Sequence, residues 1–340
     1  MPWSEQAVSL PAMLAAGFVV ALALSALGSR WAIVHAHRND LLDQPGERRS
    51  HAVPTPRGGG IGIVLACSLA LLAIGVGATR PGSWLLVAAG LLLVAAIGWW
   101  DDHRPLPAWP RLLVHALAAA CLAWAIHLQG APALAVVAAF MATVVLVNAW
   151  NFMDGIDGLA ASQGLLCALA FAAVLGDAWR SVALVVAGAC LGFLPFNFPK
   201  ARVFLGDVGS GALGYLLAAL LAAGFGSRPI PVWPLLLLPA MAMLVDTGLT
   251  LLWRLRRGDR WWQAHVQHAF QRWSRWHGHV RVTAAFAGWT FVAAAIMLAA
   301  LQWPPGVAPG VALAALLASA GAWRWLHRRY HKDKTEGFGT

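Results

Sequence analysis

The chain has 340 residues, of which 60% are hydrophobic and only 11% are Asp, Glu, Lys or Arg. For a soluble protein, this composition would leave too few polar groups to cover the surface. The net charge of +10 at pH 7 comes from the loops between apolar segments. Nucleic-acid binding is therefore a poor explanation for it, and we expect no nucleic-acid partner.

Eleven apolar segments are each long enough to cross a bilayer as a helix. They predict an all-α, polytopic integral membrane protein in which the lipid bilayer surrounds the helices. The expected spans lie near residues 11–34, 58–77, 83–100, 111–128, 132–149, 159–176, 179–196, 211–227, 232–253, 283–302 and 306–326.

The basic residues are distributed unevenly between the two sides of the membrane. Of the 24 Lys and Arg residues, all except Arg80, Arg180 and Arg228 fall on one side of the predicted topology. Because cytoplasmic loops carry an excess of Lys and Arg, the rich side is expected to be cytoplasmic. An odd number of spans then places the N-terminus outside and the C-terminus in the cytoplasm.

The first cytoplasmic loop, residues 35–57, is rich in Pro and Gly and carries His51 and Arg57. Three glycines, Gly58–Gly60, follow Arg57, and they would allow a phosphate to approach the backbone beside a cation. Ordinary positive-inside charge is the alternative explanation for the other cations of this loop.

Two adjacent carboxylates, Asp101 and Asp102, stand where the third span meets the cytoplasmic loop 101–110. Negative charge at the C-terminal end of a helix opposes the helix dipole, so the pair favours a nearby cation. Mg²⁺ or a basic side chain would supply it, and a solvated helix end is the alternative.

The segment 148–159, NAWNFMDGIDGL, carries Asn148, Asn151, Asp154 and Asp157 at every third position. On a helix or a turn at a helix end, these side chains gather towards one side. Such a group at the end of a membrane helix is costly unless it binds something. A polar turn with Asx caps would explain one Asn-Asp pair, but two Asp-Gly pairs favour a ligand site.

In the loop 197–210, Asp207 stands between two glycines immediately before the eighth span, and Phe204 precedes it by one helical turn. A carboxylate in a glycine-rich turn can reach a metal while free backbone N–H groups face phosphate oxygens. Phe204 could stack on a base. A helix N-cap is the alternative role for Asp207.

The largest cytoplasmic loop, residues 254–282, contains His265, His268 and Arg272, which share one face if residues 261–273 are helical. That face would donate hydrogen bonds to a diphosphate. Zinc binding and an amphipathic interfacial helix are the alternatives. Asp246, inside the ninth span, either supports this site or joins two helices.

All of these loops fall on the side identified independently as cytoplasmic. Carboxylates, histidines, arginines and glycine turns at one membrane face suit Mg²⁺-assisted phosphoryl chemistry between a soluble nucleotide and a lipid. The alternatives are an ion-coupled transporter, which would bind its substrate near the bilayer midplane, and a CDP-alcohol phosphotransferase, whose dense Asp-Gly-Ala-Arg signature is absent here.

The segments PTPRGGG, DD, NAWNFMDGIDGL, FLGDVGSGALGY and HVQHAFQR together resemble the polyprenyl-phosphate N-acetylhexosamine-1-phosphate transferases. The resemblance spans roughly residues 35–280, and the histidine segment is similar to the O-antigen branch of that family. It implies an enzyme of the bacterial cytoplasmic (inner) membrane. The substrates would be a UDP-N-acetylhexosamine and undecaprenyl phosphate, and the products the lipid diphosphate sugar and UMP, with a second copy of the chain as a further candidate partner.

The resemblance also implies roles for individual residues. Asp207 would bind Mg²⁺, with Mn²⁺ as the alternative ion, and Asp101 and Asp102 would serve catalysis or the lipid phosphate. The remaining candidates would bind substrate: Asn151, Asp154, Asp157 and Phe204 at the nucleotide, His265 and His268 at the diphosphate, and Arg57 and His51 in the first loop.

The family often places a lysine shortly after the paired aspartates, where this chain has His103-Arg104-Pro105. Arg104 and Arg111 are the candidate substitutes. On this interpretation, residues 1–327 form one transmembrane catalytic domain with active-site loops at 35–57, 101–110, 148–159, 197–210 and 254–282. Residues 328–340 form a basic cytoplasmic tail.

Overall fold

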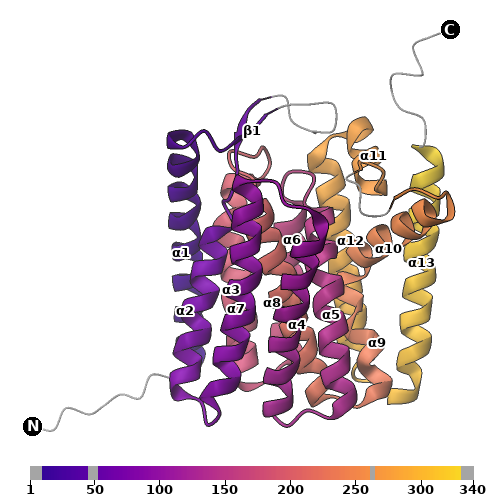
Figure 1. The fold of residues 1–340 in the computed structure, drawn as a ribbon. Helices are drawn as coiled ribbons and strands as arrows, with labels where there is room; N and C mark the ends of the chain where they lie inside the picture. The colour runs from indigo at the N-terminus through magenta and orange to yellow at the C-terminus, as the bar shows by residue number, and fades with distance from the viewer. Residues whose placement is uncertain (1–9, 45–52, 261–264, 331–340) are drawn as a thin grey trace, which may run out of the picture.

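The computed structural model describes residues 10–44, 53–260 and 265–330 as a bundle of roughly parallel helices (Figure 1). The helices are α1 (Leu10–Arg38), α2 (Ile61–Gly77), α3 (Pro81–His103), α4 (Ala108–Leu128), α5 (Ala133–Met153), α6 (Leu159–Val174), α7 (Asp177–Asn197), α8 (Gly206–Ser227), α9 (Trp233–Leu236), α10 (Met241–Arg256), α11 (Ala269–His277), α12 (His279–Ala300) and α13 (Ala308–Arg329). Short 3₁₀ helices occupy η1 (Ile230–Val232), η2 (Leu238–Ala240) and η3 (Pro305–Val307), and β1 (Leu42–Asp43) pairs antiparallel with β2 (Thr55–Pro56).

The all-α, polytopic prediction is confirmed. Within the described residues, nine helical segments are long and apolar enough to cross a membrane. Two shorter apolar helices, α2 and α6, lie at the remaining predicted positions. Each apolar segment recognised in the sequence is therefore an apolar helical segment of the bundle.

Helix α8 lies at the centre of the bundle, and its apolar window is completely buried inside the protein. It packs against α3, α5 and α6, and its sequence is dominated by Gly, Ala and Leu. Small residues allow helix backbones to approach closely in a membrane, where packing replaces the hydrophobic effect as the source of association. Asp207, in the first turn of α8, therefore stands on the most enclosed helix of the protein.

The ninth apolar segment is not the continuous span expected at 232–253. It is divided into η1, α9, η2 and α10, and a proline occupies one of the first positions of η1, α9 and η2. Because proline removes a backbone donor and clashes with the preceding turn, it ends regular helix geometry. In Figure 1, α10 accordingly lies at a steep angle to the other helices and leads towards α11.

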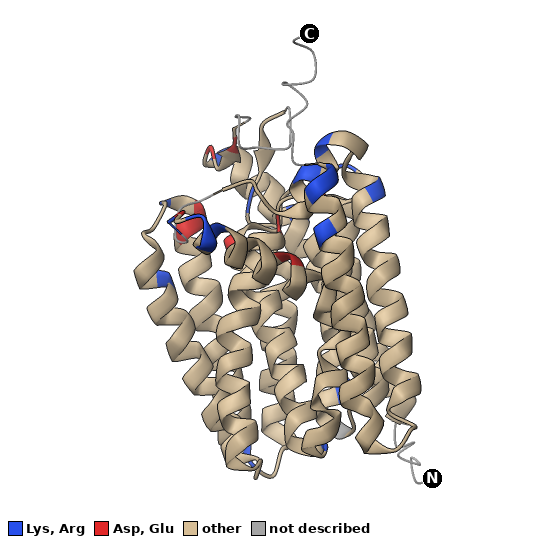
Figure 2. Cartoon of the chain, turned by 90° about the vertical axis from the view of Figure 1, so that its right-hand side faces the viewer, with Lys and Arg blue, Asp and Glu red and all other residues tan. Residues whose placement is uncertain are grey.

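Charged residues gather at one end of the bundle, the end at which α1 and α13 finish (Figure 2). Few cations lie at the opposite end. Helix α1 begins and α13 ends at opposite ends of the bundle, as an odd number of crossings requires (Figure 1). The orientation of these ends in a cell stays a prediction.

Candidate active site

The charged end of the bundle brings together candidate residues that are far apart in the sequence. Asp101 and Asp102 come from the end of α3, Asn151 from the last turn of α5, and Asp207 from the first turn of α8. Successive antiparallel helices place one C-terminal end beside the next N-terminal end. Acidic groups at the ends of α3 and α5 therefore meet the start of α8.

Arg111, in the first turn of α4, links three of these groups. Its guanidinium donates to Asp101 at 2.6 Å and to Asn151 at 3.0 Å, and it lies 3.1 Å from the carboxylate of Asp207. A planar guanidinium with several fixed donors suits such a role better than an ammonium group. Of the two arginines considered as substitutes for the family lysine, Arg111 lies in the site, whereas Arg104 is exposed.

Asp102 binds the N-terminus of α8. Its two carboxylate oxygens accept hydrogen bonds from the backbone N–H groups of Asp207 and Val208, at 3.0 and 3.1 Å. Gly206 makes this approach feasible because a Cβ there would lie 2.6 Å from Asp102 and its φ is +75°. The expectation that these backbone N–H groups face a phosphate is therefore wrong, and Asp207 is not the N-cap of α8.

The glycines after Arg57 also have a different role from the one expected. The N–H groups of Gly59 and Gly60 donate to the carbonyls of Phe204 and Leu205, both at 2.9 Å, and are thus unavailable to a phosphate. A Cβ on Gly60 would overlap the backbone of Gly209. The glycine run therefore joins the first loop to the loop that precedes Asp207.

Arg57 itself forms an ion pair with Asp43 of β1, and its charge acts on Asp102. Asp43 is almost completely buried, whereas Arg57 remains about a quarter exposed. The short β1–β2 ladder thus holds Arg57 beside the carboxylates. His51 lies outside the described residues.

Asp154 immediately follows Met153, the last residue of α5. In the part of the chain that the structure describes, it has no hydrogen bond or ion pair to its side chain. Burial, followed by repulsion from Asp207 and Asp102, raises the pKa of Asp154 to about 8. A cation bound beside Asp154 would offset this repulsion and favour the ionised carboxylate.

A magnesium ion fits this arrangement. Among the described residues, no three His, Cys, Asp or Glu side chains form a complete metal site. Mg²⁺ usually takes one or two protein carboxylates and completes its coordination with water and substrate phosphates. Asp207, whose side chain is 30% exposed, and the unpaired Asp154 provide ligands of that kind.

Asp157 joins three segments around the site. Its carboxylate accepts from the backbone N–H of Ala201 at 3.2 Å and lies 3.2 Å from His279, and its carbonyl accepts from Thr283. Asn197 adds another link by accepting from Gly158 and donating to Val203. These contacts hold the loop of Phe204 against the start of α12.

Asn197, Ser210 and His279 did not emerge from the sequence. Ser210 accepts a hydrogen bond from Asn151 at 3.2 Å and is fully buried. Each is a polar residue inside or next to a motif that the sequence analysis identified. That proximity is the one sequence feature that could have marked these residues as part of the site.

The histidine segment differs from the helix proposed for residues 261–273. Helix α11 begins only at Ala269, so His265 and His268 precede it, and residues 261–264 lie outside the described residues. The two imidazole rings are 4.8 Å apart, and the ring of His268 stacks on Phe152 of α5 at 6.3 Å. The segment thus reaches the end of α5, although its histidines do not share a helix face.

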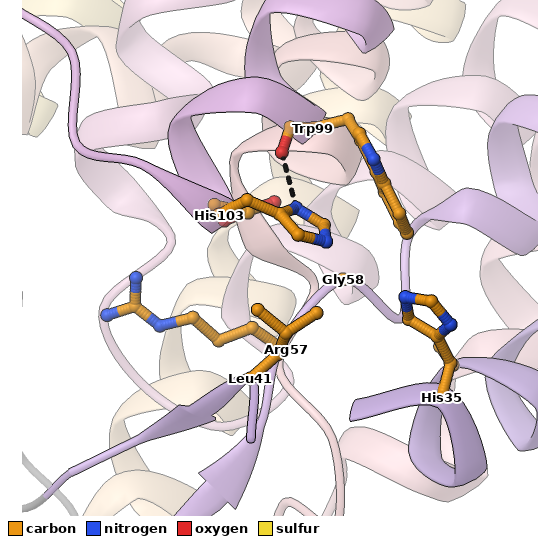
Figure 3. A pocket seen from close by; sticks show the side chains of 8 residues that line it. His35, Leu41, Arg57, Gly58, Trp99 and His103 are labelled. Atoms are coloured by element: carbon orange, nitrogen blue, oxygen red, sulfur yellow. Dashed lines mark hydrogen bonds between the residues drawn. The ribbon is translucent and has the colours of Figure 1, made fainter. Parts of the chain in front are cut away.

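A small cavity adjoins Asp102 on the α1 side of the site. Figure 3 shows five of its lining residues: His35, Arg57, Gly58, Trp99 and His103. Its volume of about 10 Å³ is the room of one water molecule. The cavity can therefore hold a water molecule beside the carboxylate of Asp102, but it is too small for a lipid or nucleotide group.

Sequence comparisons decide the family. The model of glycosyl transferase family 4 matches residues 84–224. The decaprenyl-phosphate N-acetylglucosaminephosphotransferase of Mycolicibacterium smegmatis is 31% identical in an alignment that covers 81% of this chain and 79% of that protein. The chain belongs to glycosyl transferase family 4.

Two further relatives agree with this assignment. The decaprenyl-phosphate N-acetylglucosaminephosphotransferase of Mycobacterium tuberculosis is 32% identical in an alignment that covers 84% of this chain and 82% of that protein. The phospho-N-acetylmuramoyl-pentapeptide-transferase of Heliobacterium modesticaldum is 32% identical over 235 residues, covering 60% and 72%. The family predicted from the motifs is confirmed, and this family 4 chain is a multi-pass membrane enzyme.

Proposed function

We propose that this family 4 chain transfers an N-acetylhexosamine-1-phosphate group from a UDP-sugar to undecaprenyl phosphate. The reaction releases UMP and begins the synthesis of a lipid-linked polysaccharide at the cytoplasmic face of a bacterial inner membrane. The relatives named above act, by their names, on a polyprenyl phosphate or on a phospho-sugar peptide. The convergence of four aspartates and Arg111 at the charged end of the bundle is the observation that carries the proposal.

The acceptor phosphate needs little activation. A phosphate monoester has its second pKa near ~6, so it is mostly a dianion at neutral pH. The main barrier is bringing that dianion to the β-phosphate of a nucleotide sugar. Arg57 and the histidine segment would contribute positive charge and hydrogen-bond donors there, and the group would pass directly between the two substrates in line.

Magnesium, held by Asp207 and the adjacent Asp154, would neutralise the diphosphate when bound. The protein's part is to keep these ligands in place. Arg111 fixes the carboxylate of Asp207, and Asp102 fixes its backbone. Asp101 already accepts from Arg111 and from the N–H of Leu106, so a supporting role suits both members of the aspartate pair.

The test uses purified full-length protein in lipid nanodiscs with Mg²⁺, undecaprenyl phosphate and a panel of UDP-N-acetylhexosamines. UMP and the lipid product are measured by chromatography and mass spectrometry. Asp207→Asn should abolish turnover. Asp40→Asn is the matched control, because Asp40 is an exposed aspartate at the end of α1 and should leave the rate unchanged.

Two results would overturn the proposal. One is CMP release from a CDP-alcohol in the absence of UMP release from any UDP-sugar. The other is uptake of a UDP-sugar into sealed vesicles without cleavage.

A further inference from the structure

A buried carboxylate in α10 holds a segment that lies outside the apolar helices. Asp246 is 2% exposed, and its two oxygens accept from the backbone N–H groups of Ala269 and Phe270, both at 2.9 Å. These are the first two residues of α11. An acidic side chain in a membrane segment is costly and persists where it has specific partners. Here the partners are the unsatisfied donors of a helix N-terminus, which favours negative charge.

The same carboxylate is linked to the last helix of the chain. The hydroxyl of Thr250, one turn further along α10, donates to Asp246 at 3.1 Å. The indole N–H of Trp323 in α13 donates in turn to the Thr250 hydroxyl at 3.2 Å. Thr250 is completely buried, so it has no water to replace either bond. Asp246 is therefore oriented by α13 as well as by α11.

His268 connects this network to the candidate active site. The ring of His268 is 3% exposed and lies 3.6 Å from Asp246, within ion-pair range. Its other neighbours include Phe152, beside the Asp154 turn. A Cβ on Gly155 would lie 3.1 Å from the ring of Phe270, so the first turn of α11 packs directly on the Asp154–Gly155 turn.

We propose that Asp246, Thr250 and Trp323 form a positioning network that fixes the first turn of α11 and thereby orients His268 for binding the diphosphate of the nucleotide sugar. The proposal rests on the proposed function, because it takes the ligand of the histidine segment to be a diphosphate. It makes α13, which lies beyond the matched family segment of residues 84–224, a part of substrate binding. Asp246 thereby supports the site, the first of the two roles left open by the sequence.

Conservative variants test the network without removing the carboxylate. Thr250→Val removes the hydroxyl and keeps the side-chain shape, and Trp323→Phe removes the indole donor. Thr247→Val is the matched control for the first, because Thr247 is a buried residue of α10 whose hydroxyl has no partner among the described residues. Trp325→Phe is the control for the second, because Trp325 is 57% exposed on the same helix.

The first measurement does not depend on activity. Diethyl pyrocarbonate labels accessible histidines, and mass spectrometry of the peptides gives the rate at His268, with the exposed His127 near the end of α4 as internal reference. Loss of one hydrogen bond should raise the labelling rate of His268 about fivefold through more frequent local opening. Both controls should label at the wild-type rate. Equal labelling in all variants would overturn the network even if the chain proved to have a different activity.

The second measurement asks whether Thr250 acts through His268. Thr250→Val should raise KM for the UDP-sugar about fivefold and leave KM for undecaprenyl phosphate unchanged, and Thr250→Ser should restore the wild-type value. In a His268→Ala background, Thr250→Val should have no further effect, because a coupled pair is not additive. A lower unfolding temperature with unchanged KM, or the same fold-change in both backgrounds, would show that these residues only join α10 to α13.

Discussion

Replacing Asp102 by asparagine separates a chemical role from a structural one. The carboxylate of Asp102 accepts from two backbone N–H groups at the start of α8, and an asparagine has only one oxygen to offer them. The second N–H would face an amide NH₂ group. Val208 is completely buried, so water cannot satisfy its N–H.

The cost can be worked out from these contacts. A buried donor without an acceptor costs about 1–3 kcal/mol. The lost negative charge at the N-terminus of α8 adds about 0.3–1 kcal/mol. Less repulsion of Asp154 offsets a part of this, so we expect Asp102→Asn to lower the free energy of unfolding by about 2 kcal/mol. Asp40→Asn, an exposed substitution, should stay within about 0.5 kcal/mol of wild type.

Reversible unfolding in mixed micelles measures this difference, and turnover is measured on the same samples. If Asp102 acts by holding α8, the variant should be less stable and should keep residual turnover that falls steeply on warming. A variant as stable as wild type but inactive at every temperature would refute the capping argument. It would make Asp102 a group that takes part in the chemistry.

Three other predictions follow from the same site, and a fourth follows from the topology. Arg111→Met should lower kcat by about 10²-fold or more through the loss of oriented charge, and Arg111→Lys should have an intermediate rate. Equal rates in the two variants would show that the forked donor geometry of the Arg111 guanidinium is not required. Because the folded-state pKa of Asp154 is raised to about 8, its contribution to stability is present at low pH and is lost as pH rises towards 8. Asp154→Asn in EDTA should therefore gain stability relative to wild type over pH 5–8, as followed by unfolding at each pH. If the transfer is direct, as we propose, enzyme without acceptor lipid should exchange no labelled UMP into the UDP-sugar. Exchange that Asp101→Asn or Asp102→Asn abolishes would indicate a covalent intermediate. A cysteine replacing Ala108 should react with an impermeant reagent only in opened cells, whereas one replacing Ser227 should react from outside.

The positions of the membrane helices could be predicted because length and hydropathy alone decide them. The common location of the acidic loops also followed from the sequence, since the count of Lys and Arg assigns a side to each loop. The bend in the ninth segment could also have been predicted from the sequence, because Pro231, Pro234 and Pro239 do not permit a regular helix there.

The partners inside the site could not be predicted in the same way. Asp102 binds backbone groups of Asp207 and Val208, more than a hundred positions away. Arg111 was one of two candidates until the packing of α4 against α5 and α8 selected it. The sequence indicates which residues lie at the end of a helix, whereas the packing of the helices determines which helix ends contact one another. The start of α11 was misjudged for the same reason, because it depends on the carboxylate of Asp246 in another helix.

The enclosure of α8 has a consequence for how the enzyme responds to its bilayer. The outer helices are the ones available to lipid: the apolar window of α1 is 11% buried and that of α13 is 17% buried, against 100% for α8. When a bilayer is too thick or too thin, helices in contact with lipid tilt to match it. A helix surrounded by protein on every side has no contact with lipid, so this mismatch does not act on it directly. Changing acyl-chain length should therefore alter how the proposed lipid substrate reaches the protein, while the depth of Asp207 in the protein stays constant.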